Sequence, residues 1–499
     1  MSIETEHPLY TKRKRQWEVI RDCIEGEDNV KNKGEKYLPR ASGSNDMQYL
    51  AYKKRARWIN YTSRTLDGLH GLIFRRNPVI ECSDTFKATG ILDNIDRRGT
   101  SIYQFLSDSI YDSMITCFGG FLVDMPKSEG ILSKYDEEKL GIRPYLRYYP
   151  AESIINWRYG IINGVEQLCL VVLKEESDIP VGDEFSHDLK TIYRVLDIND
   201  GYYRQRLFDV DDNGEYSVQE INILVNGERI TEIPFVMLPS KTPEKPMLLD
   251  LAYCNIGHYQ KSADYENGVH LTTIPTGYVT GHKSIVDENG EPEAIHLGHD
   301  SFLQFEESEA KVGTLVFSGV GLTHSETALL QSMSDMRTLG SRLVIPEKGI
   351  TESADSAKIH RAGENAMLAT FAKNVSDKIS SAIRIIEQWC GLEPSISVEL
   401  CTDYDTLSFD PNAINALANL SEANKLPIPY LYWNLRNGEY APPNSTLEEY
   451  CTLLQMEESS MTPLEIIQTY RQMQQGKKIT IDNSNKNITG KEENNEETD

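Results

Sequence analysis

The sequence lacks the features that mark membrane and secreted proteins. No run in its 499 residues reaches the roughly 18 apolar, uncharged residues that a transmembrane helix needs. The first eight residues, MSIETEHP, contain no apolar core of the kind found in signal peptides. We therefore expect no membrane association.

Motifs for catalysis and metal binding are also missing. None of the eight cysteines forms a C-x-x-C pair, which argues against a zinc ribbon or a thioredoxin-type site. The chain contains neither a G-x-x-x-x-G-K-[ST] phosphate loop nor a G-x-S-x-G nucleophile motif. Several cysteines lie in apolar runs, which is typical of reduced thiols in a cytoplasm. The sequence predicts a protein that is not an enzyme and needs no cofactor.

Positive charge is scarce outside the N-terminal part. The formal net charge is −25, although the first 100 residues carry a small positive excess. A protein this acidic does not grip DNA through a broad basic face, but it can surround DNA without binding it tightly. Acidic charge more often serves solubility alone. Two basic clusters, 12–15 and 53–57, are candidates for nucleic-acid contact, although solvated helix faces are the commoner explanation.

The stretch from 324 to 391 contains the strongest helical signal. Apolar residues recur at three- and four-residue steps over 324–344 and again over 356–390. Pro346 ends the first helix and Gly391 ends the second. The second helix would be about 50 Å long at 1.5 Å per residue. It is either a core helix of a mostly helical domain or a brace beside a loop that points into a shared channel.

The remaining elements predict an α+β fold. Helices are expected over 9–25, 46–74, 101–117 and 247–269. Between 143 and 239 the apolar period is two, with Asn-Gly and Asp-Gly turns between the runs. That pattern predicts one antiparallel β module with strands at 145–149, 165–173, 190–196, 202–210, 216–225 and 231–238.

One metal motif matches formally. Asp209, Asp211, Asn213 and Glu220 fit the calcium-loop pattern D-x-[DN]-x-[DN]-G-x5-E. The flanking residues alternate as strands do, whereas the pattern requires helices on both sides. We interpret the match as a hairpin turn and expect no bound metal.

Eight short segments of the chain carry a resemblance to known proteins: WEVIRDCIEGE (17–27), GEKYLP (34–39), YKKRA (52–56), RTLDGL (64–69), YYPAE (148–152), LDLA (249–252), HY (258–259) and SADYEN (262–267). They resemble a phage family long catalogued as a domain of unknown function, and the order of elements resembles the portal proteins of tailed double-stranded DNA phages.

The resemblance implies a division into the parts of a portal subunit. The parts are an α/β wing (1–245, with a strand in 392–410), two stem helices (246–270 and 324–344), a small α/β clip (271–323), a tunnel loop (345–355), a long bracing helix (356–391), a helical crown (411–475) and a disordered tail (476–499). The tunnel-loop residues nearest the DNA channel would be Glu347, Lys348, Gly349, Ile350, Thr351, Glu352 and Ser353.

The resemblance also implies a role and partners. Such proteins form rings of about twelve copies, a dodecamer with cyclic symmetry, at one vertex of the virion capsid. The channel passes double-stranded DNA during genome packaging and ejection. The expected partners are the terminase large subunit, major capsid and scaffold proteins, and head-completion or adaptor proteins, with assembly in the host cytoplasm. The alternatives are another ring-forming head-connector component and a mixed α/β cellular enzyme.

Overall fold

The computed structural model describes most of the chain up to residue 402 and parts of the remainder. The described residues are 2–126, 141–162, 164–180, 185–210, 216–273, 276–280, 309–315, 319–344, 354–402, 404, 415–417, 419–420, 423, 426–437, 447–458, 479–480 and 489–490. The chain divides into two compact units, Met1–Asp403 and Tyr404–Asp499. The elements are mixed α and β, in agreement with the expected α+β class.

Helices dominate the first part of unit 1. They are α1 (Pro8–Glu25), α2 (Glu27–Asn32), α3 (Asp46–Arg55), α4 (Tyr61–Ile73), α5 (Asp84–Ala88) and α6 (Ile102–Thr116), with short 3-10 turns at Gly34–Lys36 and Ile91–Asp93. Trp17 of α1 is fully buried, and its indole N–H donates to the carbonyl of Thr116 over 3.0 Å. The first and the sixth helix are thereby joined through a satisfied buried donor.

A single helix over 46–74 was expected, and that expectation is wrong. The chain breaks between α3 and α4, where Ala56 has an extended ψ of 136°. Asn60 then caps α4 by accepting from the amide of Ser63 over 3.0 Å. The buried Asn255 of a later helix accepts from the amide of Tyr61 and donates to the carbonyl of Ile59. A distant side chain thus satisfies backbone groups that a continuous helix would have paired internally.

The β region forms two main sheets rather than one module. A three-stranded sheet has the order β11-β2-β3, and a five-stranded antiparallel sheet has the order β4-β5-β6-β7-β8. Their bounds are β2 Gly119–Asp124, β3 Tyr145–Pro150, β4 Ile154–Ile162, β5 Val165–Pro180, β6 His187–Asn199, β7 Tyr202–Val210, β8 Tyr216–Ile221 and β11 Phe235–Leu238. Strand β2 is the centre of the smaller sheet, where it pairs with β3 on one side and β11 on the other. Leu224–Val225 (β9) and Glu228–Arg229 (β10) form a small hairpin between β8 and β11.

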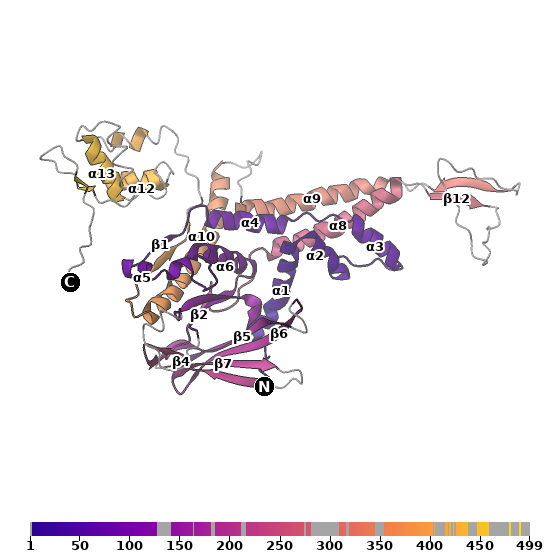
Figure 1. Cartoon of the computed structure of the whole chain (residues 1–499). Coiled ribbons are helices and arrows are strands. Elements are labelled where there is room, and N and C mark those ends of the chain that lie inside the picture. The colour runs from indigo at the N-terminus through magenta and orange to yellow at the C-terminus, as the bar shows by residue number, and fades with distance from the viewer. Residues whose placement is uncertain are drawn as a thin grey trace. The chain divides into compact units, whose positions relative to one another are not determined.

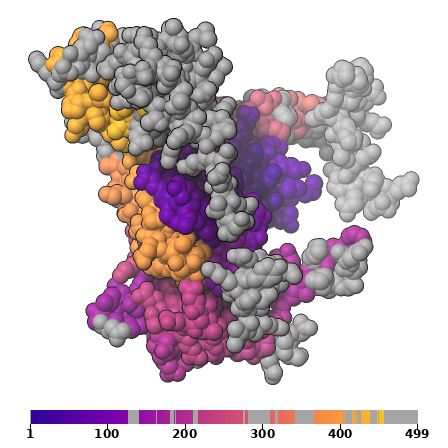
Figure 2. Space-filling model, turned by 60° about the vertical axis from the view of Figure 1, so that its left-hand side comes forward, coloured from indigo at the N-terminus to yellow at the C-terminus, as the bar shows by residue number. Residues whose placement is uncertain are grey.

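Three long helices follow the sheets. They are α8 (Leu249–Thr273), α9 (Val320–Val344) and α10 (Ala354–Trp389), and Figure 1 shows α8 and α9 lying along each other. The pair β12 (Thr276–Thr280) and β13 (Lys311–Leu315) stands between α8 and α9 in the chain. In Figure 2 the orange residues of α10 lie above the magenta residues of the β region. The helix α10 packs on β2 and β11.

The end of α10 is tied to a two-stranded sheet. Strand β14 (Ser397–Glu399) pairs with β1 (Val79–Glu81), which brings the residues after α10 back to the N-terminal third of the chain. The buried carboxylate of Glu387 accepts from the amides of Ser395 and Ile396 at 2.7 and 3.0 Å, and from the Ser395 hydroxyl at 2.9 Å. Gly391 ends the helix with a φ of 74°, as expected.

Unit 2 contains two described helices, α12 (Ile428–Asn437) and α13 (Leu447–Glu458). They meet at Tyr432, which is 1% exposed and lies 5.4 Å from the ring of Tyr450. Ile479–Thr480 and Thr489–Gly490 form a short antiparallel pair (β15 and β16).

Candidate functional site

The most distinctive feature of unit 1 is the antiparallel pair of helices α8 and α9. Each helix has 25 residues, or about 37 Å at 1.5 Å per residue. Three contacts fix their direction: Leu251 approaches the position of Gly340, His258 binds Ser332, and Gly268 faces Leu322. Residue numbers rise along one helix as they fall along the other, so the two helices run antiparallel over nearly their whole length.

Small and polar residues bring these helices close together. Nδ1 of His258 and Oγ of Ser332 share a hydrogen bond of 2.8 Å, and both residues are 2% exposed. A Cβ atom on Gly268 would lie 2.7 Å from Leu322, and one on Gly340 would lie 3.6 Å from Leu251. Burial, and secondly the nearby Lys261, lower the pKa of His258. The histidine is therefore neutral at neutral pH and acts as an uncharged link between the helices.

The second basic cluster lies against α8. The guanidinium of Arg57 pairs with Glu266 over 2.8 Å, and Arg55 donates to the side chain of Asn267 over 3.2 Å. Tyr52 donates to Asp264 over 2.6 Å. Two of the cations that were candidates for DNA contact thus bind groups of α8, and α3 supports the distal half of that helix.

The strand pair β12–β13 stands at one end of the helix pair. Only residues 274–275 separate α8 from β12, and residues 316–319 separate β13 from α9. Five residue pairs join the strands, from Thr276 opposite Leu315 to Thr280 opposite Lys311. Tyr278, Val312 and Leu315 are each about half exposed, at 49, 54 and 50%. A two-stranded ribbon by itself is only marginally stable, so half-exposed apolar side chains on β12 and β13 favour contact with further groups.

The predicted tunnel loop lies outside the described residues. All seven residues from Glu347 to Ser353 fall between the end of α9 at Val344 and the start of α10 at Ala354. Their place in the chain, between two long helices, agrees with the sequence expectation. Their role remains a prediction.

The calcium-type motif lies on a hairpin of strands. Asp209 belongs to β7 and Glu220 to β8, two antiparallel neighbours, while Asp211 and Asn213 lie outside the described residues. Asp209 pairs with Lys190 over 2.5 Å and Glu220 with Arg204 over 3.3 Å. The carboxylates of Asp209 and Glu220 therefore already form ion pairs with Lys190 and Arg204. Within the described ranges, no three His, Cys, Asp or Glu side chains cluster as metal ligands would.

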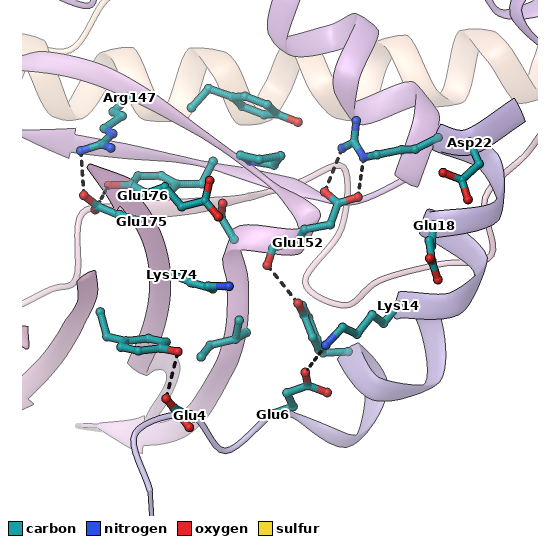
Figure 3. A pocket seen from close by; sticks show the side chains of 18 residues that line it. Glu4, Glu6, Lys14, Glu18, Asp22, Arg147, Glu152, Lys174, Glu175 and Glu176 are labelled. Atoms are coloured by element: carbon teal, nitrogen blue, oxygen red, sulfur yellow. Dashed lines mark hydrogen bonds and ion pairs between the residues drawn. The ribbon is translucent and has the colours of Figure 1, made fainter. Parts of the chain in front are cut away.

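A charged hollow of about 900 Å³ opens between α1 and the strands β3 and β5 (Figure 3). Its charged lining residues are the acids Glu4, Glu6, Glu18, Asp22, Glu152, Glu175 and Glu176 and the bases Lys14, Arg21, Arg147 and Lys174. Most of them pair with one another: Lys14 lies 2.6 Å from Glu6, and Arg147 lies 3.1 Å from Glu175. Arg21 joins Glu152 to Asp112 of α6. These pairs neutralise much of the lining and hold α1 against the sheets.

Three buried groups of the hollow have shifted pKa values. Burial works to raise the pKa of Glu175, but the guanidinium of Arg194, 2.6 Å away, outweighs it and the pKa lies below its usual value. Burial, reinforced by Asp112 and Glu175 respectively, raises the pKa of Tyr148 and Tyr149 well above that of a free phenol. The carboxylate is ionised and the phenols are protonated at neutral pH, so each group keeps its ordinary charge. The hollow is built as a structural ion-pair network.

Sequence reasoning did not single out the hollow. Its residues come from three distant parts of the chain, around 4–22, 147–155 and 174–193. The only sequence signals were the segments at 17–27 and 148–152, which include Arg21 and Glu152. Arg21 and Glu152 are 131 residues apart in the sequence, so only the folded chain brings them into contact.

Among the comparisons with known proteins, one family model matches the helical region of unit 1. A family model described as "Domain of unknown function (DUF4055)" matches residues 247–390, which run from the start of α8 to the end of α10. No curated protein matches the chain. A solved structure described as "Neck of empty GTA particle computed with C6 symmetry" aligns over 78% of this chain and 93% of its own, at 11% identity and a TM-score of 0.34. The described part of the chain contains no helix that is both long and apolar enough to span a bilayer.

Proposed function

We propose that this chain is a portal protein, a structural subunit of a ring at one capsid vertex of a tailed double-stranded DNA phage. The observation that carries the proposal is the arrangement of α8, β12–β13, α9 and α10. A strand pair lies in the connection between two long antiparallel helices. A 36-residue helix follows them after a nine-residue segment. This arrangement suits a ring in which each subunit contributes two stem helices and one bracing helix.

The surfaces of the helix pair support assembly. Tyr253 of α8 is 51% exposed, and Leu330 and Leu339 of α9 are 60 and 41% exposed. In a ring, neighbouring copies would cover these large apolar side chains, which are 41 to 60% exposed on the two helices. The net charge of −25 would reduce adhesion between the ring and DNA, which must slide past it.

The proposed division of the chain follows the portal parts. The wing is 1–245 with the strand in 392–410, the stem is 246–270 and 324–344, the clip is 271–323, the tunnel loop is 345–355, the bracing helix is 356–391, the crown is 411–475 and the tail is 476–499. In this proposal the clip receives the terminase motor during packaging and head-completion proteins afterwards. The wing faces the capsid and scaffold proteins.

Lys348 has a specific proposed role in DNA translocation. It is the only cation in the segment 345–355, where Glu347 and Glu352 flank it. A single positive charge in an acidic loop would approach the phosphate backbone transiently. Lys348→Glu is expected to reduce the packaging rate or packaged DNA length in an in vitro packaging reaction, while Lys373→Glu, on the exposed side of α10, leaves both unchanged. Unchanged packaging by Lys348→Glu would refute this role.

The state of assembly tests the proposed function directly. Native mass measurement should find particles near twelve times the 56.7 kDa chain, and negative-stain images should show rings with a central hole. Particles of one or two chains would favour the alternative of a mixed α/β enzyme. Rings that bind a tail or adaptor protein but never a terminase would favour another head-connector component.

A further inference from the structure

We infer that residues 2–7, a strap that precedes α1, form a proton-sensitive latch on the five-stranded sheet, and that the strap opens when His7 takes up a proton. Closed, the strap covers one edge of that sheet and one side of the charged hollow. The latch is independent of the proposed ring, because the strap and the groups that it contacts belong to one subunit.

The strap covers β4, which lies at one edge of the sheet. The amide of His7 donates to the carbonyl of Ile155 over 2.9 Å, and the side chain of Asn156 donates to the carbonyl of Thr5 over 2.8 Å. An edge strand has backbone groups that can pair with another chain, and a covering segment is one of the ways in which proteins prevent such pairing. Opening the strap would therefore uncover this edge.

The strap also forms one side of the charged hollow. Glu4 and Glu6 are among the residues that line it (Figure 3). The carboxylate of Glu4 accepts from the phenols of Tyr193 on β6 and Tyr216 on β8 over 3.3 and 3.2 Å. The carboxylate of Glu6 pairs with Lys14 of α1 over 2.6 Å. Opening the strap would move both carboxylates out of the hollow.

His7 connects the strap to α1 through a cap on the helix. Pro8 is the first residue of α1 and has no amide hydrogen, so the first amide that needs a partner is that of Leu9. This amide donates to Nδ1 of His7 over 3.1 Å. Because an amide can only donate, Nδ1 carries no proton and the imidazole is neutral. The ring also stacks on Trp157 of β4, with the centroids 4.0 Å apart.

A proton on Nδ1 would remove this cap. The imidazolium ion has two N–H donors and no acceptor, so the amide of Leu9 would face another donor. The new charge would also lie at the N-terminus of an 18-residue helix, where the helix dipole disfavours cations. A cation–π attraction to Trp157 would remain, but it supplies no acceptor for the amide. Serine, threonine and asparagine are the usual caps and do not titrate, so the histidine makes this cap depend on pH.

His7 is the one histidine among the groups at this contact. Burial lowers its pKa. The phenols of Tyr10 and Tyr159 keep their protons, because burial raises the pKa of each to about 12. Histidine is the side chain whose charge ordinarily changes between about pH 5 and 8. The charged residues of the strap, of the first two turns of α1, and of β4 with the turn before it are Glu4, Glu6, Lys12, Arg13, Lys14, Glu152 and Arg158.

The direction and size of the effect follow from proton linkage. In the open strap His7 titrates near the free value of about 6.5, and in the closed strap its pKa is lower. The open strap therefore binds more protons, and opening becomes more favourable as the pH falls below that free value. One histidine can shift the equilibrium by at most about tenfold between about pH 7.5 and about pH 5.5. We expect a shift of about three- to tenfold toward the open strap.

Hydrogen–deuterium exchange of the full-length chain at these two pH values tests the latch. Each exchange rate is divided by the intrinsic rate at the same pH, which removes the chemical pH dependence and leaves a protection factor. In the wild type, protection of residues 3–11 should fall about three- to tenfold at the lower pH, and protection of 154–158 should fall with it. Protection of residues 192–196 in the central strand β6 should fall less, which separates strap opening from unfolding of the sheet.

Two variants of His7 test whether the proton acts there. His7→Asn keeps a capping acceptor that does not titrate, so protection of residues 3–11 should be equal at both pH values within about twofold. His7→Ala has no acceptor, and protection should be as low at both pH values as it is in the wild type at the lower one. The control is His324→Gln on α9, an exposed position, which should keep the pH dependence of the wild type.

Three results would overturn the latch. The first is equal protection of residues 3–11 in the wild type at both pH values, a measurement that needs no variant. The second is a His7→Asn chain with the pH dependence of the wild type, because the proton would then act elsewhere. The third is a His7→Ala chain that is as well protected as the wild type at the higher pH, because the cap would then not hold the strap.

Discussion

At the residue scale, buried polar side chains hold the turns and helix ends of unit 1. Glu387 is fully buried and accepts three hydrogen bonds from the turn after α10. Asn255 is fully buried and satisfies backbone groups in the break between α3 and α4. Each residue lies on the buried face of its helix and supplies a partner for backbone groups that regular secondary structure would otherwise pair.

Replacing Glu387 should destabilise unit 1. Glu387→Ala leaves the amides of Ser395 and Ile396 buried without an acceptor, which costs about 2–4 kcal/mol of the free energy of unfolding. Urea unfolding followed by circular dichroism measures the difference. Glu393→Ala, at an exposed position in the same turn, is the matched control and should change stability by less than about 0.5 kcal/mol. Equal stability of the two variants would contradict a structural role for Glu387.

His258 should make stability depend on pH. Its pKa is lowered in the folded protein, whereas in the unfolded chain it is near 6.5. Below that unfolded value the unfolded chain takes up a proton that the folded chain refuses, so the free energy of unfolding falls as pH drops toward the folded pKa. The variant His258→Gln cannot take up this proton. Its free energy of unfolding should therefore fall less than that of the wild type between about pH 7.5 and about pH 5.5.

The control for this measurement is His324→Gln, which changes an exposed histidine on α9. It should lose as much stability over the same pH range as the wild type. If His258→Gln also matched the wild type, the pH dependence would arise elsewhere. The buried contact with Ser332 would then have no part in it.

At the element scale, close helix contacts decide how α9 sits in unit 1. Gly340 brings α9 against α4, where a Cβ atom would lie 2.6 Å from Thr65 Oγ1 and 3.6 Å from Leu251. Thr65 is buried and β-branched, so it has little freedom to move aside. Side chains at this crossing, rather than helix propensity, fix the position of α9.

Gly340→Ala should destabilise the chain by about 1–3 kcal/mol because the added methyl group overpacks this crossing. Gly257→Ala is the matched control, since a Cβ atom on Gly257 of α8 meets nothing within 4 Å. That control should gain up to about 1 kcal/mol from helix propensity. Opposite signs in thermal or urea unfolding would confirm the contact, and a stabilised Gly340→Ala would refute it.

At the scale of the whole molecule, the segment between α8 and α9 should separate assembly from docking. Replacing 274–318 by a short Gly-Ser linker keeps the contacts His258–Ser332 and Gly268–Leu322, which lie within the helices. We expect rings to form, although poorly, and terminase binding to be lost because its docking surface is gone. Mass photometry and a terminase pull-down measure the two properties. Normal terminase binding would refute the assignment of 271–323 as the clip.

Local sequence patterns predicted the long elements well. The helices expected over 9–25, 101–117, 247–269 and 324–344 correspond to α1, α6, α8 and α9, and Ala354–Trp389 matches the expected bracing helix. These segments bury one face along many turns, so their apolar period is long enough to identify them. The turns Asn199-Asp-Gly201 and Asn226-Gly227 were also found where expected, with positive φ at Asp200, Gly201, Asn226 and Gly227.

Other features depended on contacts between distant parts of the chain. The strand β2 pairs with residues 145–150 on one side and with residues 235–238 on the other, so strands far apart in the sequence form the smaller sheet. The strand β4 was not anticipated, because its sequence, IINWRYGII, does not alternate regularly. The charged hollow likewise requires Arg21 to meet Glu152 and Asp112.

The amino-acid sequence by itself determined the mixed composition, the acidic charge, the long helices and their place in the chain, because each depends on neighbours within about two helical turns. Only the tertiary structure decided the break at 56–60, the antiparallel contact of α8 with α9, and the distribution of the strands between two sheets. Each of these depends on which distant residue satisfies a backbone group or fills a space. Local periodicity carries no information about that choice.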